Sequence, residues 1–86
     1  MKNIVIMEWY DKSANLTFTA VTKFDTEPQA FTFARHYIRQ QKADGVEAIA
    51  APIDLDCLKE LVKSGVVNCE WYDPIKKEYC TIDSLV

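Results

Sequence analysis

A single histidine and three cysteines are the side chains best suited to nucleophilic chemistry in this chain. The histidine is His36, and the cysteines are Cys57, Cys69 and Cys80. A thiol beside an imidazole can act as a nucleophile with an adjacent general base. His36 follows Arg35 inside a segment of helical periodicity, however, and the cysteines fall at apolar-face positions of other segments. We therefore predict a solvated histidine, packed thiols and no catalytic residue.

The acidic and cysteine spacings do not predict a metal centre. No Cys-x-x-Cys pair occurs, and zinc sites need further ligands at fixed spacing. Asp54, Asp56 and Glu60 form an acidic cluster that lacks the glycine and ligand spacing of a calcium loop. A helix cap at Asp54 and a favourable charge in the first turn account for this cluster. The sequence predicts no cofactor and no metal, and leaves open whether Cys69 and Cys80 are bridged.

A basic strip is the feature that could bind nucleic acid. Arg35, Arg39 and Lys42 fall on one side of the first predicted helix, where they could meet phosphates or an acidic partner. The chain carries ten basic and thirteen acidic residues, a net charge of −3. This balance does not mark a nucleic-acid binder, and no recognised nucleic-acid-binding motif is present. Nucleic-acid binding through this strip is a second alternative function.

Tyrosines beside glutamates form the most informative group of polar residues. Glu8 and Tyr10 lie near the end of one predicted strand, and Glu70 and Tyr72 near the end of another. With alternating side chains, these four residues project from the non-core face, and Tyr79 joins them from the last strand. Exposed tyrosines are enriched at protein–protein contacts because they bury a large area at small entropic cost. We predict that these five residues bind a partner.

A four-residue motif occurs twice and defines the architecture. Glu8-Trp9-Tyr10-Asp11 recurs as Glu70-Trp71-Tyr72-Asp73, each at the end of an apolar strand and directly before a turn. Alternation places both tryptophans in the core. Neighbouring positions agree as well: Val5 and Met7 with Val67 and Cys69, and Phe18 and Thr19 with Cys80 and Thr81. Either a duplicated unit, residues 4–21 and 66–83, or two similar solutions for a half-buried hairpin would explain the match.

Periodicity predicts the elements that position these residues. Alternation and β-branched residues indicate strands, and Thr26 with Gln29 has the spacing of a capping box that opens a helix. Gly45 and Gly65 suit the ends of two helices. The predicted elements are strands 4–10 and 16–24, a helix from 26 to about 43, an uncertain strand 46–51, a helix from 54 to Gly65, and strands 66–72 and 78–82.

Together these elements predict one α+β domain over residues 1–86, with the order β-β-α-(β)-α-β-β. We expect an antiparallel sheet formed from both hairpins, with two intervening helices on one side and the tyrosines on the other, together with Thr17, Thr19 and Thr81. The chain is 49% hydrophobic, yet no apolar run approaches a membrane span. Glu8 and Asp11 interrupt the apolar start, which argues against a signal peptide. We predict a cytoplasmic protein.

Without a catalytic or nucleotide motif, the sequence favours a non-enzymatic function. Our first hypothesis is a small regulator or inhibitor that occupies a surface of a larger protein, of the type that phages encode against host defence systems. A homodimer through an open sheet edge or the tyrosines is an additional expectation. The alternative is a small-molecule-binding or enzymatic domain whose cleft, between sheet and helices, is lined by Tyr37, His36 or the acidic cluster.

Overall fold

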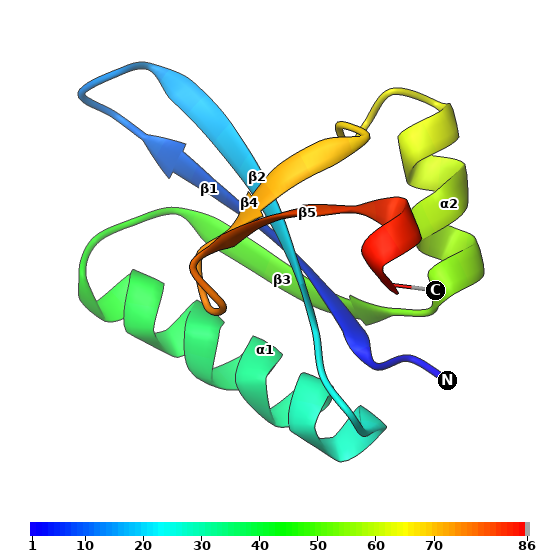
Figure 1. Ribbon diagram of the computed structural model, residues 1–86. Coiled ribbons are helices and arrows are strands. Elements are labelled where there is room, and N and C mark those ends of the chain that lie inside the picture. The colour runs from blue at the N-terminus through cyan, green and yellow to red at the C-terminus, as the bar shows by residue number, and fades with distance from the viewer. Residues whose placement is uncertain (86) are drawn as a thin grey trace.

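The computed structural model describes residues 1–85 and has two α-helices, five strands and a short 3-10 helix (Figure 1). The predicted order of strands and helices and the α+β fold are confirmed. The elements are β1 (Ile4–Asp11), β2 (Leu16–Lys23), α1 (Glu27–Ala43), β3 (Ala48–Ile53), α2 (Leu55–Lys63), β4 (Glu70–Asp73), β5 (Glu78–Thr81) and the 3-10 helix η1 (Ile82–Leu85).

The strands form two sheets and not the single sheet that we expected. The first has the order β2-β1-β3 with both pairings antiparallel, and the second contains only β4 and β5. The expectation of one shared sheet was wrong because β3, whose existence the sequence left uncertain, pairs with β1 at the position that the C-terminal hairpin would have needed. The C-terminal hairpin instead packs beside β2.

Both helix starts and ends form as the sequence predicts. The Thr26 hydroxyl accepts a hydrogen bond from Gln29 N–H, and the Gln29 side chain accepts one from Thr26 N–H, which completes the capping box before α1. Asp54 caps α2 by accepting from Cys57 N–H at 2.7 Å. After the helices, Gly45 and Gly65 have φ of 74° and 81°, a region that favours glycine.

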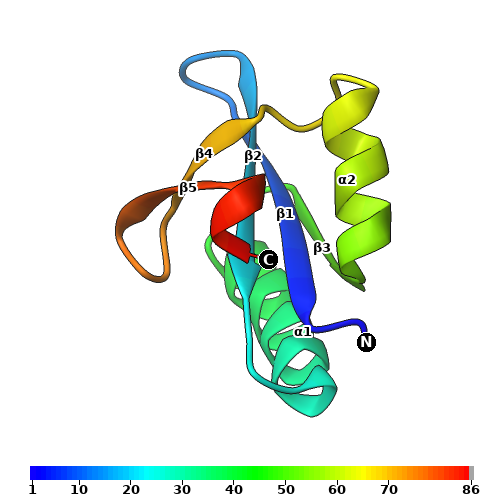
Figure 2. The same ribbon diagram turned by 45° about the vertical axis from the view of Figure 1, so that its right-hand side comes forward.

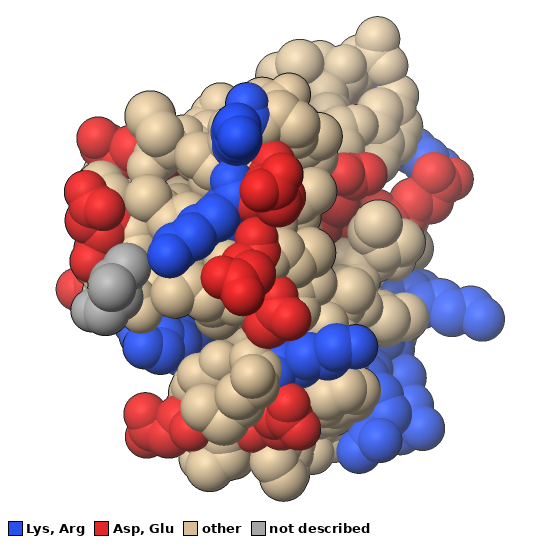
Figure 3. Space-filling view, turned by 90° about the vertical axis from the view of Figure 1, so that its right-hand side faces the viewer, with Lys and Arg blue, Asp and Glu red and all other residues tan. Residues whose placement is uncertain are grey.

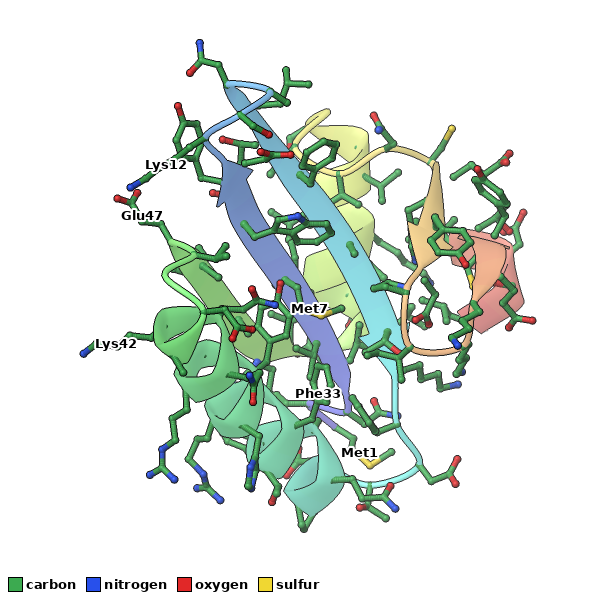
Figure 4. All side chains as sticks on the ribbon, turned by 90° about the vertical axis from the view of Figure 1, so that its left-hand side faces the viewer. Met1, Met7, Lys12, Phe33, Lys42 and Glu47 are labelled. Carbon is green, nitrogen blue, oxygen red and sulfur yellow. The ribbon has the colours of Figure 1, made fainter. Side chains whose placement is uncertain are left out.

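Helix α1 covers one face of the three-stranded sheet. Alternate residues of β1, including Val5 and Met7, are fully buried against Ala30 and Ala34 of this helix. Figure 4 shows Met7 between the sheet and α1, near Phe33. These small alanines let the helix approach the sheet closely, so the layer is well packed although α1 is largely polar.

The opposite face of the sheet is covered as well, contrary to the expectation of helices on one side only. Ile4 and Val21 pack there against Leu58 of α2, Trp71 of β4 and Leu85 of η1. Figure 2 shows α2 on one side of this layer and the turn of the C-terminal hairpin on the other. The sheet is therefore the middle of three layers, with a separate apolar cluster on each side.

Two segments differ from their predicted boundaries. Pro52, expected to end the third strand, lies inside β3 opposite Val5, where its nitrogen points away from β1 and no ladder hydrogen bond is lost. Residues 66–69 do not belong to β4, although Val67 is buried. Val66 N–H and Val67 N–H both donate to Leu61 O, so the chain there continues the end of α2 before the strand begins.

Candidate protein-binding surface

The two copies of the repeated motif form the same local structure. Oδ1 of Asp11 accepts hydrogen bonds from the backbone N–H groups two and three residues later, and Oδ1 of Asp73 does the same. The fourth residue after each aspartate has a positive φ, 52° at Asn15 and 56° at Lys77. The strand registers agree too, because each aspartate pairs across its hairpin with the residue five positions later in the chain. Whether the likeness reflects a duplication stays a prediction.

The C-terminal hairpin is fixed to the body of the protein from its inner face. Trp71 is only 5% exposed, and its Nε1 donates to the backbone oxygen of Val21 at 2.9 Å. Asp73 is buried beside it, and Cys80 faces Trp71 across the pair. Because these side chains hold β4 and β5 in place, the outer face of the hairpin is presented on a rigid support.

That outer face carries an exposed tyrosine pair. Tyr72 and Tyr79 are directly opposite each other, with ring centroids 5.2 Å apart in an edge-to-face arrangement. Tyr72 is 46% and Tyr79 73% exposed. Glu70 and Thr81 form the next pair on this face, and both are exposed. We refer to Glu70, Tyr72, Tyr79 and Thr81 as the tyrosine surface.

The structure does not bring Glu8 and Tyr10 to this surface, because they lie on the other sheet. Tyr10 is half-buried, its hydroxyl donates to Oδ1 of Asn15, and it faces Thr17 and not another tyrosine. Glu8 is exposed and faces Ile49 of β3. The five predicted partner-binding residues therefore divide into a group of three and a group of two.

The cysteines occupy different environments and form no disulfide in the described chain. Cys57 and Cys69 are exposed, contrary to the expectation that every thiol packs on an apolar face, whereas Cys80 is buried. Burial raises the pKa of the Cys80 thiol, and the charges of Asp73 and Glu78 raise it further. Cys80 is therefore a protonated core thiol and a poor nucleophile.

His36 and the basic strip lie on α1, on the opposite side of the sheet from the cysteines. His36 is exposed, while Cys80 belongs to the cluster on the other face, so no cysteine–histidine pair forms between them. Arg35, Arg39 and Lys42 are all exposed on α1. Figure 4 shows Lys42 pointing away from the molecule, as does Glu47 beyond the helix.

The residues that the sequence offered as alternative linings of a cleft lie in different parts of the structure. His36 borders an open groove of about 560 Å³ with Phe24 and Phe33. Asp54 and Asp56 line a smaller one of about 330 Å³ on the other side of the sheet. Burial raises the pKa of Tyr37, which packs against the core under α1. Among the described residues, no three His, Cys, Asp or Glu side chains gather as a metal ion would require.

The surface charge is mixed on the face that carries α2. In Figure 3, acidic and basic side chains are interspersed there without a field of one sign. Such a face gives little electrostatic attraction for a polyanion. In residues 1–85, neither helix has the length and apolarity needed to cross a membrane.

Several exposed apolar residues were not identified by the sequence analysis as candidates for contacts, and three of them are isoleucines. Ile75 lies in the turn between β4 and β5, Ile49 on β3, and Ile38 on a flank of α1. Helical spacing alone would put Ile38 with the core-facing residues of α1, but it lies at the margin of that face and is 38% exposed. Ile49 and Ile75 gave no signal, because isolated apolar residues occur on every protein surface.

Comparison with models of protein families, with curated proteins and with solved structures finds no match to this chain.

Proposed function

We propose that this protein is a non-enzymatic regulator or inhibitor that binds a larger protein through the tyrosine surface. The observation that carries the proposal is the exposed Tyr72–Tyr79 pair on a hairpin that is anchored from behind by Trp71. Large aromatic side chains with few torsions lose little entropy on binding, and a rigid support lowers that cost further.

The size and charge of the tyrosine surface limit the class of protein that could bind there. A pair of four-residue strands offers less area than the ~800 Å² that each side of a standard interface buries, so the tyrosines would form its central anchor. Glu70 lies on the same face, and Glu78 and Asp83 are exposed nearby in the chain. Lys76 and Lys77 in the turn are exposed as well. The rings therefore favour a partner with an apolar pocket, and the charges of both signs favour a mixed polar rim around it.

We also propose that the protein works in a reducing compartment such as the cytoplasm. Three unbridged thiols, two of them exposed, support this proposal, since exposed thiols are readily oxidised in secreted proteins.

Capture from a lysate of the source organism, with mass spectrometry of the bound proteins, is the first step of the test. The Tyr72→Ala and Tyr79→Ala variants should each weaken binding of the identified partner at least about thirtyfold. Tyr10→Ala is the matched control, because Tyr10 has the equivalent position in the other hairpin and lies outside the tyrosine surface. If both tyrosine variants fold and bind as tightly as the native protein, the proposed surface is wrong.

A further inference from the structure

The two edges of the three-stranded sheet differ in how they are protected. On the β2 edge, the Trp71 indole occupies the backbone oxygen of Val21, and Lys23 adds a charge. The β3 edge has neither. Within residues 1–85, β3 pairs only with β1, and no charged side chain lies between Ala48 and Ile53. An uncovered edge strand without charges is a template for one more strand.

The ladder identifies which backbone groups of β3 point outward. Tyr10 N–H donates to Glu47 O at 2.9 Å, so alternate residues after Glu47 exchange hydrogen bonds with β1. The N–H and C=O groups of Ala48 and Ala50, and the C=O of Pro52, therefore point away from the sheet. The small alanine side chains leave these groups accessible to another backbone.

The flank of α1 beside this edge carries two exposed apolar residues, with Arg35 between them and opposite charges at its two ends. Phe31 and Ile38, one heptad apart, are both exposed. Ile38 and Lys42 line an open depression of about 550 Å³ that reaches the start of β3, which places this flank next to the edge. Glu27 lies four residues before Phe31, and Lys42 four residues after Ile38, so helical spacing keeps all four on one flank.

We propose that a second copy of this chain binds here, by antiparallel pairing of β3 with β3 about a two-fold axis at Ala50. Each Ala50 then exchanges N–H and C=O hydrogen bonds with Ala50 of the other copy. Each Ala48 N–H meets a Pro52 C=O, and Pro52 has no N–H that the pairing could leave buried without an acceptor. The dimer would contain one continuous sheet of six strands.

A second copy fits this surface because the same axis makes the flank self-complementary. The two α1 helices become antiparallel, so Phe31 of one copy faces Ile38 of the other, and Glu27 faces Lys42. Both pairs have the same midpoint, beside Ala34. Ala34 and Ala50 belong to the same core cluster, and the proposed dimer requires the midpoint of α1 to lie near the axis. Apolar residues thus meet apolar ones, and opposite charges meet at the rim. The two Arg35 residues lie near the axis, where their exposed side chains must extend into solvent to avoid each other.

Sedimentation of the full chain over a range of concentrations tests the proposal. We expect a reversible dimer, and Ala50→Pro and Ile38→Glu should each raise its dissociation constant more than about tenfold. Ala50→Pro removes only an outward N–H, as Pro52 already does in this strand. Matched controls are Thr17→Pro, which removes an outward N–H on the β2 edge, and Thr32→Glu on the solvent side of α1; both should stay dimeric.

Hydrogen exchange and cross-linking test the pairing itself. The Ala48 and Ala50 amides should exchange quickly at low concentration and more slowly in the dimer. In chains whose exposed Cys57 and Cys69 are replaced by serine, Ile49→Cys should cross-link to Ala51→Cys of another copy, since these positions face each other in this register. A monomer at millimolar concentration, or a dimer that Ala50→Pro leaves intact, would overturn the proposal. Tyr72→Ala should not affect the dimer, which separates this test from that of the partner surface.

Discussion

The two hairpins contain the same four residues in the same register and turn, but their environments differ. At the tip of the first, Trp9 is half-buried and stacks on Phe18 at a centroid distance of 5.6 Å, and Phe18 is 40% exposed. In the second, Trp71 and its partner Cys80 belong to the core. Local sequence therefore determines the turn and the pairing, whereas burial depends on which element packs over the strand.

The largest expected difference between the hairpins is in the cost of truncating each tryptophan. Trp71→Ala should lower the free energy of unfolding by about 3–5 kcal/mol, because it empties a core position and removes the donor to Val21 O. Trp9→Ala should cost about 2 kcal/mol, because that ring is only partly buried. Chemical denaturation monitored by circular dichroism measures both losses. Equal losses of unfolding free energy in the two variants would contradict the expected difference between the hairpins.

The two turn aspartates should differ next. Asp73 is 1% exposed and accepts two backbone hydrogen bonds, so Asp73→Ala would leave both N–H groups without this acceptor and should cost about 2 kcal/mol. Asp73→Asn keeps the acceptor and is the matched control. Asp11→Ala should cost less, because water can replace the lost carboxylate at that exposed turn. Thermal unfolding of the three variants ranks the effects, and a larger loss at Asp11 would refute the ranking.

Thiol labelling should distinguish the buried residue opposite Trp71 from the exposed cysteines. Cys57 and Cys69 should react quickly, and Cys80 at least about tenfold more slowly, because it is buried and its pKa is raised. The protonated Cys80 thiol stabilises the folded protein fully at pH values below the pKa that this thiol has in the unfolded chain. Because the pKa is higher in the folded protein, this contribution is lost as the pH rises through that higher value. Mild denaturant should remove the difference in rate. Rapid labelling of all three thiols in native buffer would contradict a buried Cys80.

The smallest effect concerns the exposed turn. A hydrogen bond from the Ser13 hydroxyl, then backbone N–H donors, lower the pKa of Asp11 below its ordinary 3.8. A lowered folded pKa means that the ionised carboxylate supports the turn above pH 3.8 and that this support is lost as pH falls through the lower folded value. Carboxyl NMR titration should show the pKa of Asp11 moving back up in Ser13→Ala. An unchanged titration would mean that the hydroxyl has no such role.

The difference between the two hairpins also explains which features the sequence could predict and which it could not. Asp and the following residues determine the turns locally, and alternation correctly placed Trp71 in the core and Tyr72 on the outer face. Trp9, also expected in the core, is only half-buried. Helix caps are equally local, so both helices ended as predicted. Alternation also separates the two faces of a strand, but it cannot identify the element that covers each face. The tyrosines of the two hairpins were therefore assigned to one face, although they lie on different sheets.

The uncertain third strand had the widest consequence for the prediction. Its alanines and Pro52 resemble neither a strong strand nor a helix, and its place beside β1 depends on tertiary packing. Once β3 takes that place, the C-terminal hairpin can no longer join the sheet there, and its tyrosines become a separate surface. Both candidate surfaces, at the hairpin and at the β3 edge, thus follow from one strand whose sequence signal is weak.

The bond between the Trp71 indole and Val21 joins positions 50 residues apart in the chain. A hairpin with strands of four residues is marginal in isolation, so it needs a template that already exists. We infer that this hairpin is stable only when it packs against the three-stranded sheet, because Trp71 and Cys80 are buried there. A variant in which the hairpin detaches would leave the outward groups of β2 at Val21 open, so that both edges of its sheet could recruit strands from other molecules.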